Sequence, residues 1–155
     1  MTDTAATDTP AFDPSTMTGL ELLEALTPML EKVPNIGRLL GMRTDHLEPG
    51  MVVFSLETQP DFANPLGTTH GGICATLLDS VMGCAVHTTL EPGVGYGTLE
   101  LKVNYIRSVP TDGRRLTATG TVVHAGRRTA TAEGRVVDED GKLVAHATTT
   151  CMIHR

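Results

Sequence analysis

Residues 72–89, GICATLLDSVMGCAVHTT, are apolar at most positions. The stretch is too long for a strand, and it has too many apolar positions for a helix that exposes one face to solvent. It therefore predicts a helix that is buried on most sides. Asp79 lies in its middle, and a carboxylate among apolar neighbours is costly unless it is paired, hydrogen-bonded or used chemically.

After this helix the hydrophobic pattern changes to the two-residue period of strands. Apolar residues occupy the odd positions from 99 to 105 and polar residues the even positions between them, which predicts one long strand. Three segments rich in Thr, Val and Ala follow, separated by the hairpin signals Ala125-Gly126 and Asp140-Gly141. Before the helix, residues 42–59 predict two strands joined by a turn at Pro49.

The N-terminal part of the chain predicts short helices. Thr18 and Glu21 form a capping-box pattern ahead of a leucine-rich stretch, so a helix begins there. Pro28 is poorly tolerated inside a helix, and with Thr27 as a cap it would open a new one. We therefore expect either two short helices or one kinked helix up to about Val33.

The order of these elements predicts the fold class. Residues 34–41, PNIGRLLG, add a turn and a short helical piece, and residues 1–15 have the composition of a flexible tail. The remaining residues, 16–155, then form a single domain of class α+β. An antiparallel sheet of this kind covers its apolar face by wrapping the single long helix.

Composition narrows the class of protein. At 155 residues the chain is long enough to bury a real core, and 40% hydrophobic residues fit a globular protein. A net charge of -6 argues against nucleic acid or an anionic membrane as the main partner. No stretch approaches the ~20 apolar residues of a membrane span, and the acidic, Thr-rich N-terminus does not resemble a secretory signal.

The cysteines and histidines do not form a metal-site pattern. Cys74, Cys84 and Cys151 have no metal-ligand spacing, and their odd number predicts reduced, mostly buried thiols in a cytoplasmic protein. The 6 His residues are scattered along the chain, so we expect no structural metal.

Small or polar residues recur at i, i+4, i+7 and i+11 along one narrow stripe of the predicted helix. They are Gly72, Thr76, Asp79 and Gly83. Such a stripe leaves room beside the carboxylate, as a substrate channel would need. Close packing of the helix against a strand or a second copy of the chain also favours glycine, and the residue pattern alone leaves both interpretations open.

The helix begins with His70, Gly71 and Gly72, which leave its first turn open to approach. The first N–H groups of a helix lack intrahelical partners, and together with the helix dipole they favour negative charge. A carbonyl oxygen there would be polarised and its developing oxyanion stabilised. Asp79 lies about 10 Å further along the axis, and its side chain leans back toward the N-terminus. The spacing is compatible with a carbonyl at the helix start and an attack point near Asp79.

Three segments resemble hotdog-fold acyl-coenzyme A (acyl-CoA) thioesterases: NPLGTTHGGICATLLDSVMG, TLELKVNYIRSV and GRRTATAEGRVVDEDGKLVAHATTTCMI. The similarity covers roughly residues 40–154 and is greatest with the phenylacetate-degradation type and the 4-hydroxybenzoyl-CoA thioesterases. It implies a hotdog fold, in which a curved antiparallel sheet wraps a long central helix. It also implies a hydrolase of small aromatic or medium-chain acyl-CoA, with no metal or redox cofactor, that forms a homodimer and then a homotetramer.

The resemblance implies a role for each matching residue. Asp79 would be the nucleophile or general base. The Gly71 N–H would hold the thioester oxygen, with support from His70 and Asn64. Thr98 would match a hydroxyl that orients the attacking water across a dimer interface.

Other matching positions would contact the substrate. Gly72, Thr76 and Gly83 would line the channel, although some relatives have a water-positioning Thr at the place of Gly83. Arg127 and Arg128 follow a hairpin in the region where family members contact CoA phosphates with basic residues. Exposed charges at a sheet edge are the alternative interpretation of these two arginines.

The remaining candidates also have structural interpretations. Asp79 would be a buried acid paired with a partner subunit, and His70 would cap the helix or stabilise the loop before it. Asn64 would hold its own turn before Pro65, and Thr98 would be an ordinary strand residue.

Two other functions are consistent with the same fold. A non-catalytic acyl-CoA sensor or carrier would bind the thioester without releasing free thiol. A hydratase or dehydratase needs a catalytic His paired with an acid in a different motif, whereas His70 lies outside the helix body. Thiol release and product analysis separate these three functions.

Overall fold

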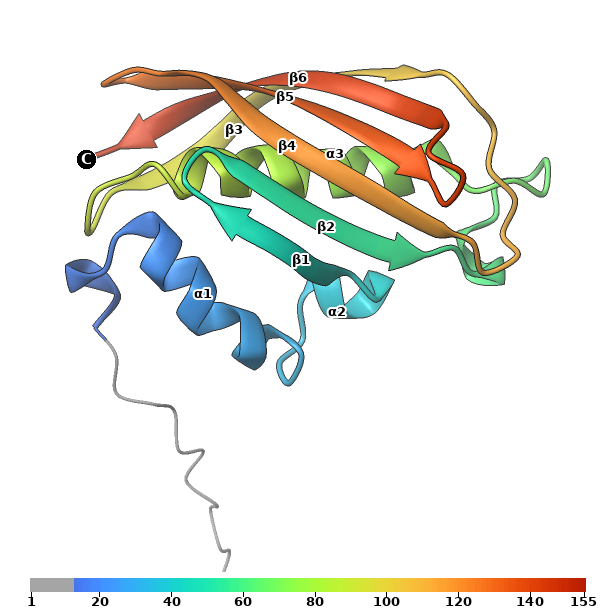
Figure 1. The fold of residues 1–155 in the computed structure, drawn as a ribbon, viewed down its shortest axis with the longest axis horizontal. Coiled ribbons are helices and arrows are strands. Elements are labelled where there is room, and N and C mark those ends of the chain that lie inside the picture. Colours follow the sequence, from blue (N-terminus) through green and yellow to red (C-terminus); the bar gives the residue numbers. More distant parts are fainter. Residues whose placement is uncertain (1–12) are drawn as a thin grey trace, which may run out of the picture.

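The computed structural model describes residues 13–155, in which one six-stranded antiparallel sheet wraps around a long helix (Figure 1). The helices are α1 (Gly19–Leu30), α2 (Ile36–Leu40) and α3 (Gly71–His87), with 3-10 turns at Pro14–Thr16 and Pro60–Phe62. The strands are β1 (Arg43–Glu48), β2 (Met51–Glu57), β3 (Gly95–Tyr105), β4 (Arg115–Ala125), β5 (Thr129–Asp138) and β6 (Leu143–His154). Their order across the sheet is β1-β2-β4-β5-β6-β3, and the predicted α+β architecture is confirmed.

Helix α3 is the buried helix that the sequence predicts. Its fully buried side chains are Leu77, Leu78, Val81, Met82, Ala85 and Val86. Strand β4 passes so close that a Cβ atom on Gly120 would lie 2.5 Å from the backbone of Val81. The glycine therefore sets how tightly the sheet closes on the helix.

The N-terminal helices begin where their caps lie. The Glu21 N–H donates to Thr18 Oγ1 at 3.3 Å, and the Thr18 N–H donates to Glu21 Oε2 at 2.8 Å, so the capping box is confirmed. The Asn35 side chain caps α2. Of the tail predicted over residues 1–15, residues 1–12 lie outside the described residues, and the rest leads into the first 3-10 turn.

Of the two alternatives for Pro28, a new helix is wrong, and a single helix that continues past Pro28 is observed. Helix α1 runs through Pro28 and ends two residues later at Leu30. Thr27 caps nothing, because its hydroxyl donates to the backbone oxygen of Leu23 at 2.8 Å. A proline inside a helix removes one backbone hydrogen bond. Because Pro28 lies only two residues before the end of α1, the helix tolerates this loss.

Strand β3 differs from the simple alternation that predicted it. It begins at Gly95, and a bulge between Thr98 and Glu100 leaves Leu99 54% exposed. Leu101 and Val103 still pack against the core, so the predicted apolar face holds only in the middle of the strand. The reason is its position: β3 is an edge strand of the sheet, next to β6 alone.

The turns predicted between the other strands are confirmed. Strands β1 and β2 join at Pro49 and Gly50, and the hairpins β4–β5 and β5–β6 turn at Gly126 and Gly141. Gly141 has a φ of 74°, a left-handed conformation that favours glycine. Within residues 13–155, no helix is long and apolar enough to cross a membrane.

Candidate active site

Asp79 and Thr98 meet between α3 and the edge strand β3. The Thr98 hydroxyl donates to Asp79 Oδ1 at 2.9 Å. Asp79 is partly buried, and among residues 13–155 no basic side chain forms a salt bridge with it. The carboxylate therefore has one oxygen that is oriented by a hydroxyl of the neighbouring strand.

A cavity of about 390 Å³ opens beside this pair. Five elements or segments contribute to its walls, namely α1, α2, the chain around β1 and β2, α3 and β3. Its apolar lining consists of Leu23, Leu30, Ile36, Met42, Phe54 and the ring of Tyr96. The carboxylate of Asp79 is thus placed at the wall of a largely apolar space.

Tyr96 and Cys84 border the same cavity as neutral groups. Burial raises the pKa of the Tyr96 phenol far above its usual range, and burial also raises the pKa of the Cys84 thiol to about 11. Neither group ionises near neutral pH, so Asp79 is the acid or base that α3 and β3 contribute to these walls, whereas Glu31, which also lines the cavity, is exposed.

Gly83 serves close packing within the chain. A Cβ atom on Gly83 would lie 2.7 Å from Tyr96 Oη, so the phenol occupies the space that a side chain there would need. The alternative that glycine allows a strand to approach the helix therefore holds at this position. Gly83 itself does not open a channel, but it lets Tyr96 reach the wall of the cavity.

At the start of α3, the polar side chains hold local structure. His70 Nδ1 accepts a hydrogen bond from the Gly72 N–H at 2.9 Å, which makes His70 the N-cap of α3. Asn64 Oδ1 accepts from the N–H groups of Leu66 and Thr68 at 2.9 and 3.3 Å, as an Asx turn requires. Both contacts match the structural interpretations of these residues, and the substrate roles stay predictions.

The predicted site residues divide among three cavities. Asp79 and Thr98 line the first. His70, Gly72 and Thr76 line a second, of about 460 Å³, in which Ile36 and Leu40 also take part. Asn64 and Gly71 line a third, of about 370 Å³, beside Tyr105 and Arg107. The structure therefore brings Asp79 together with Thr98, but not with the Gly71 N–H of the same chain, which lies eight residues or about 12 Å back along the helix.

Arg127 and Arg128 lie in the turn between β4 and β5 and are exposed. The side chain of Arg155 reaches this turn and donates to the backbone oxygen of Arg127 at 3.3 Å. Neither arginine of the turn lines the three cavities described above. Three basic side chains therefore gather at one end of the sheet, and contact with CoA phosphates stays a prediction.

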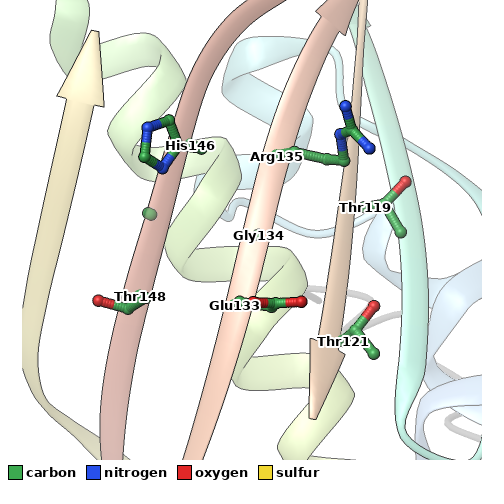
Figure 2. A pocket seen from close by; sticks show the side chains of 8 residues that line it. Thr119, Thr121, Glu133, Gly134, Arg135, His146 and Thr148 are labelled. Carbon is green, nitrogen blue, oxygen red and sulfur yellow. The ribbon is translucent and has the colours of Figure 1, made fainter. Parts of the chain in front are cut away.

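A separate hollow of about 250 Å³ lies on the outer face of β4, β5 and β6 (Figure 2). Its polar lining is Thr119, Thr121, Glu133, Arg135, His146 and Thr148. Gly120 and Gly134 on the same strands face α3, so their neighbours point to the opposite side of the sheet. This hollow is thus separated by the sheet from Asp79 and does not belong to the same site.

Comparison with known proteins identifies the family. The sequence model of the family described as "Thioesterase superfamily" matches residues 66–145. The chain belongs to the thioesterase superfamily. The matched segment contains Gly71, Asp79 and Thr98, whereas α1, α2 and Asn64 precede it.

Relatives of this thioesterase-superfamily chain act on acyl-CoA according to their names. The medium/long-chain acyl-CoA thioesterase YigI of Escherichia coli is 29% identical over 131 residues, which cover 75% of this chain and 83% of the relative. The 1,4-dihydroxy-2-naphthoyl-CoA hydrolase of Listeria monocytogenes is 26% identical over 116 residues, covering 75% of this chain and 93% of the relative.

Solved structures agree with this family. A variant of the phenylacetic acid degradation protein PaaI from Thermus thermophilus is 36% identical, with a TM-score of 0.69 over 75% of this chain and 96% of that chain. A thioesterase from Haemophilus influenzae has a TM-score of 0.76 over 86% of this chain and 90% of that chain, and its 21% identity shows the shared fold alone. The expected similarity to hotdog thioesterases of the phenylacetate-degradation type is confirmed.

Sequence reasoning missed several residues of the cavity beside Asp79. Tyr96 is one of them, and no local pattern in the sequence indicated that it lies beside Asp79. Leu30 and Ile36 lie in the N-terminal helices, where their periodicity indicated nothing beyond an apolar face. Only the packing of α1 and α2 over α3 brings them to the carboxylate.

Proposed function

We propose that this chain hydrolyses the thioester bond of acyl-CoA, with a small aromatic or medium-chain acyl group as substrate and Asp79 as nucleophile or general base. One observation carries the proposal. The Asp79 carboxylate, oriented by Thr98 at 2.9 Å, borders a largely apolar cavity within a segment that matches thioesterases. A structural acid would have a cation or several donors instead, since a buried charge needs such partners.

Two routes of hydrolysis use the same carboxylate. As a general base, Asp79 takes a proton from water while the water oxygen bonds to the thioester carbon. The C–S bond then breaks, and the departing CoA thiolate takes up the proton. As a nucleophile, Asp79 itself bonds to the carbon and expels the thiolate, and water then hydrolyses the mixed anhydride. In both routes the Thr98 hydroxyl fixes one carboxylate oxygen and leaves the other to react.

The oxygen of the thioester needs a hydrogen-bond donor, and we assign this to the Gly71 N–H at the start of α3. A carbonyl that accepts at about 2.9 Å and is attacked at about 3–3.5 Å bridges at most about 8 Å, or about 10 Å when a water lies between its carbon and the carboxylate. The rise from Gly71 to Asp79 in one helix is about 12 Å. We therefore propose that the Gly71 N–H of one protomer faces the partner's Asp79, so that each site is shared between two copies.

The edge strand β3 supports such a dimer. It has 11 residues, carries Thr98 and pairs within the sheet on one side only. A long unpaired edge strand is a surface that proteins usually cover, and pairing of β3 with a second β3 would bring two copies of Asp79 and Thr98 to one interface. Assembly of two dimers into a tetramer and a cytoplasmic location stay predictions.

His70 and Asn64 support the site as positioning residues. His70 caps the first turn of α3, and Asn64 folds the loop that precedes it. Together they fix the direction of the Gly71 N–H, because a capped helix start is more rigid than a frayed one. Their effect on turnover is then indirect.

The test is release of free thiol from phenylacetyl-, hydroxybenzoyl-, hexanoyl- and palmitoyl-CoA, with Asp79→Asn and Asp79→Ala measured in parallel. We expect release by the wild-type protein and its loss in both variants, with circular dichroism unchanged. Stoichiometric binding without thiol release would support the sensor or carrier instead. A hydrated thioester as product would support the hydratase.

A further inference from the structure

The cavity beside Asp79 has a wall that the family match does not include. Helix α1 contributes Leu23 and Leu30, and α2 contributes Ile36. Both helices precede the matched residues 66–145, and both lie beside the sheet and α3 rather than within the sheet (Figure 1). This part of the site therefore lies outside the segment that matches the family model.

Two polar side chains of this wall, Thr27 and Asn35, already have hydrogen-bond partners within the chain. The Thr27 hydroxyl donates to the backbone oxygen of Leu23. The Asn35 amide accepts from Arg38 N–H and donates to the backbone oxygens of Leu30 and Val33. A hydroxyl group of an occupant would lose water without gaining a free partner in Thr27 or Asn35, and such a loss is costly.

The apolar side chains in this wall are only partly covered. Leu30 is 41% exposed and Ile36 is 52% exposed. Both side chains line the cavity, so an apolar occupant would take their surface out of water. The charged residues that also border the cavity, Glu31, Arg38 and Arg43, are themselves exposed.

Helix α1 is fixed to the core at one end. The Gly19 N–H donates to the backbone oxygen of Leu90 at 3.0 Å, and a Cβ atom on Gly19 would overlap the backbone oxygen of His87. This attachment holds the helix against the C-terminal end of α3. The wall is thus a fixed surface whose side chains set the room beside the carboxylate.

We propose that the α1–α2 segment determines substrate specificity, with Leu23, Leu30 and Ile36 holding an unsubstituted hydrocarbon acyl chain beside Asp79. The inference rests on the proposed thioesterase function and narrows it. It selects a straight-chain acyl group over a hydroxylated aromatic one. Each methylene that enters the cavity raises kcat/KM about fourfold until the cavity is full.

The experiment compares matched tryptophan variants from the same segment. Leu30→Trp and Ile36→Trp alter the wall, whereas Val33→Trp and Leu39→Trp alter residues of similar or greater exposure, 45% and 73%, that do not line the cavity. All four positions are exposed enough to accept a larger side chain. The measurement is kcat/KM for acyl-CoA substrates from butanoyl to palmitoyl, together with hydroxybenzoyl-CoA.

We expect the wall variants to lose at least tenfold in kcat/KM on the longer acyl chains and to keep butanoyl-CoA within about threefold of wild type. The control variants should keep the wild-type profile. Equal profiles for wall and control variants, or a wild-type preference for hydroxybenzoyl-CoA, would overturn the inference while leaving the thioesterase function intact. Absence of thiol release from every substrate would overturn the thioesterase function itself.

A binding measurement gives a second readout that does not depend on turnover. In an Asp79→Asn background, calorimetry with decanoyl-CoA should show weaker binding for Ile36→Trp than for Leu39→Trp by about tenfold. Ile36→Ala should shift the preferred chain length upward, since it enlarges the same wall. Equal affinity of all three variants would contradict the assignment of Ile36.

Discussion

The polar residues just before α3 and the carboxylate in its middle use their hydrogen-bonding atoms in opposite ways. At the start of the helix, His70 and Asn64 direct their hydrogen-bonding atoms to nearby backbone N–H groups. In the middle, Asp79 has a hydrogen bond from Thr98 and borders an apolar cavity. The first arrangement stabilises local structure, and the second orients a carboxylate at the wall of a cavity. The role of a polar residue in this motif therefore depends on whether its hydrogen bonds are already made within the protein.

The largest expected effect comes from removing the charge at Asp79. Asp79→Asn keeps an oxygen for the Thr98 hydroxyl but abolishes the base, so we expect kcat to fall by about 10²–10⁴. The free energy of unfolding should change little, because the side chain has no salt bridge to lose within the described chain. Steady-state thiol release and urea unfolding measure the two quantities. Unchanged kcat would remove Asp79 from the mechanism.

The next effect comes from the hydroxyl that orients the carboxylate. Thr98→Val removes the 2.9 Å hydrogen bond and conserves the side-chain volume. A hydrogen bond to a charged group contributes about 1.5 kcal/mol or more, so we expect kcat to fall about tenfold with KM nearly unchanged. Thr98→Ser serves as the matched control, because it keeps the hydroxyl and should retain most of the activity. A Ser variant as slow as the Val variant would indicate that packing, and not the hydroxyl, matters at this position.

The stabilising role of the polar residues just before α3 is tested at His70. His70→Ala removes the cap of α3, so the free energy of unfolding should fall by about 1 kcal/mol. Turnover should fall by less than in Asp79→Asn, since the Gly71 N–H is displaced rather than lost. His70→Asn restores a capping oxygen and should recover the stability. Failure of Asn to recover either quantity would give the imidazole a role beyond capping.

The sequence predicted the parts of the fold that follow local rules. The apolar run around Asp79, the capping box at Thr18 and the glycine turns each depend on neighbours a few residues away, and the structure has them where expected. The bulge beside Thr98 and the continuation of α1 through Pro28 depend on sheet-edge position and on distance from the helix end, which no local pattern encodes.

The residues of the candidate site also differ in how far the sequence alone predicts them. Asp79 could be predicted because a carboxylate in an apolar run conflicts with burial, and that conflict is visible in the sequence alone. Its neighbour Thr98 required the family resemblance, since Thr is common in strands. Tyr96 and Ile36 could not be predicted, because their contact with the cavity arises only when segments far apart in the chain pack together.

The smallest expected effect concerns His87 at the far end of α3. Burial lowers the pKa of this imidazole, and its ring packs against Tyr96 with a centroid distance of 5.5 Å. Because the folded state binds the proton less readily than the unfolded state, the protein should lose stability as pH falls below about 6.5, the ordinary pKa of histidine. Above that pH both states are neutral at His87, and the effect disappears.

The variant His87→Phe keeps an aromatic ring beside Tyr96 and removes the titration. We expect its free energy of unfolding to depend less steeply on pH between about 6.5 and 5 than that of the wild type. His124→Gln, at an exposed position, is the control and should retain the wild-type slope. Because His87 also lies against Gly19 at the start of α1, the same acid range should loosen the wall of the cavity before the sheet unfolds. Hydrogen exchange that rises in α1 ahead of β4 and β5 would support this order, and simultaneous exchange would exclude it.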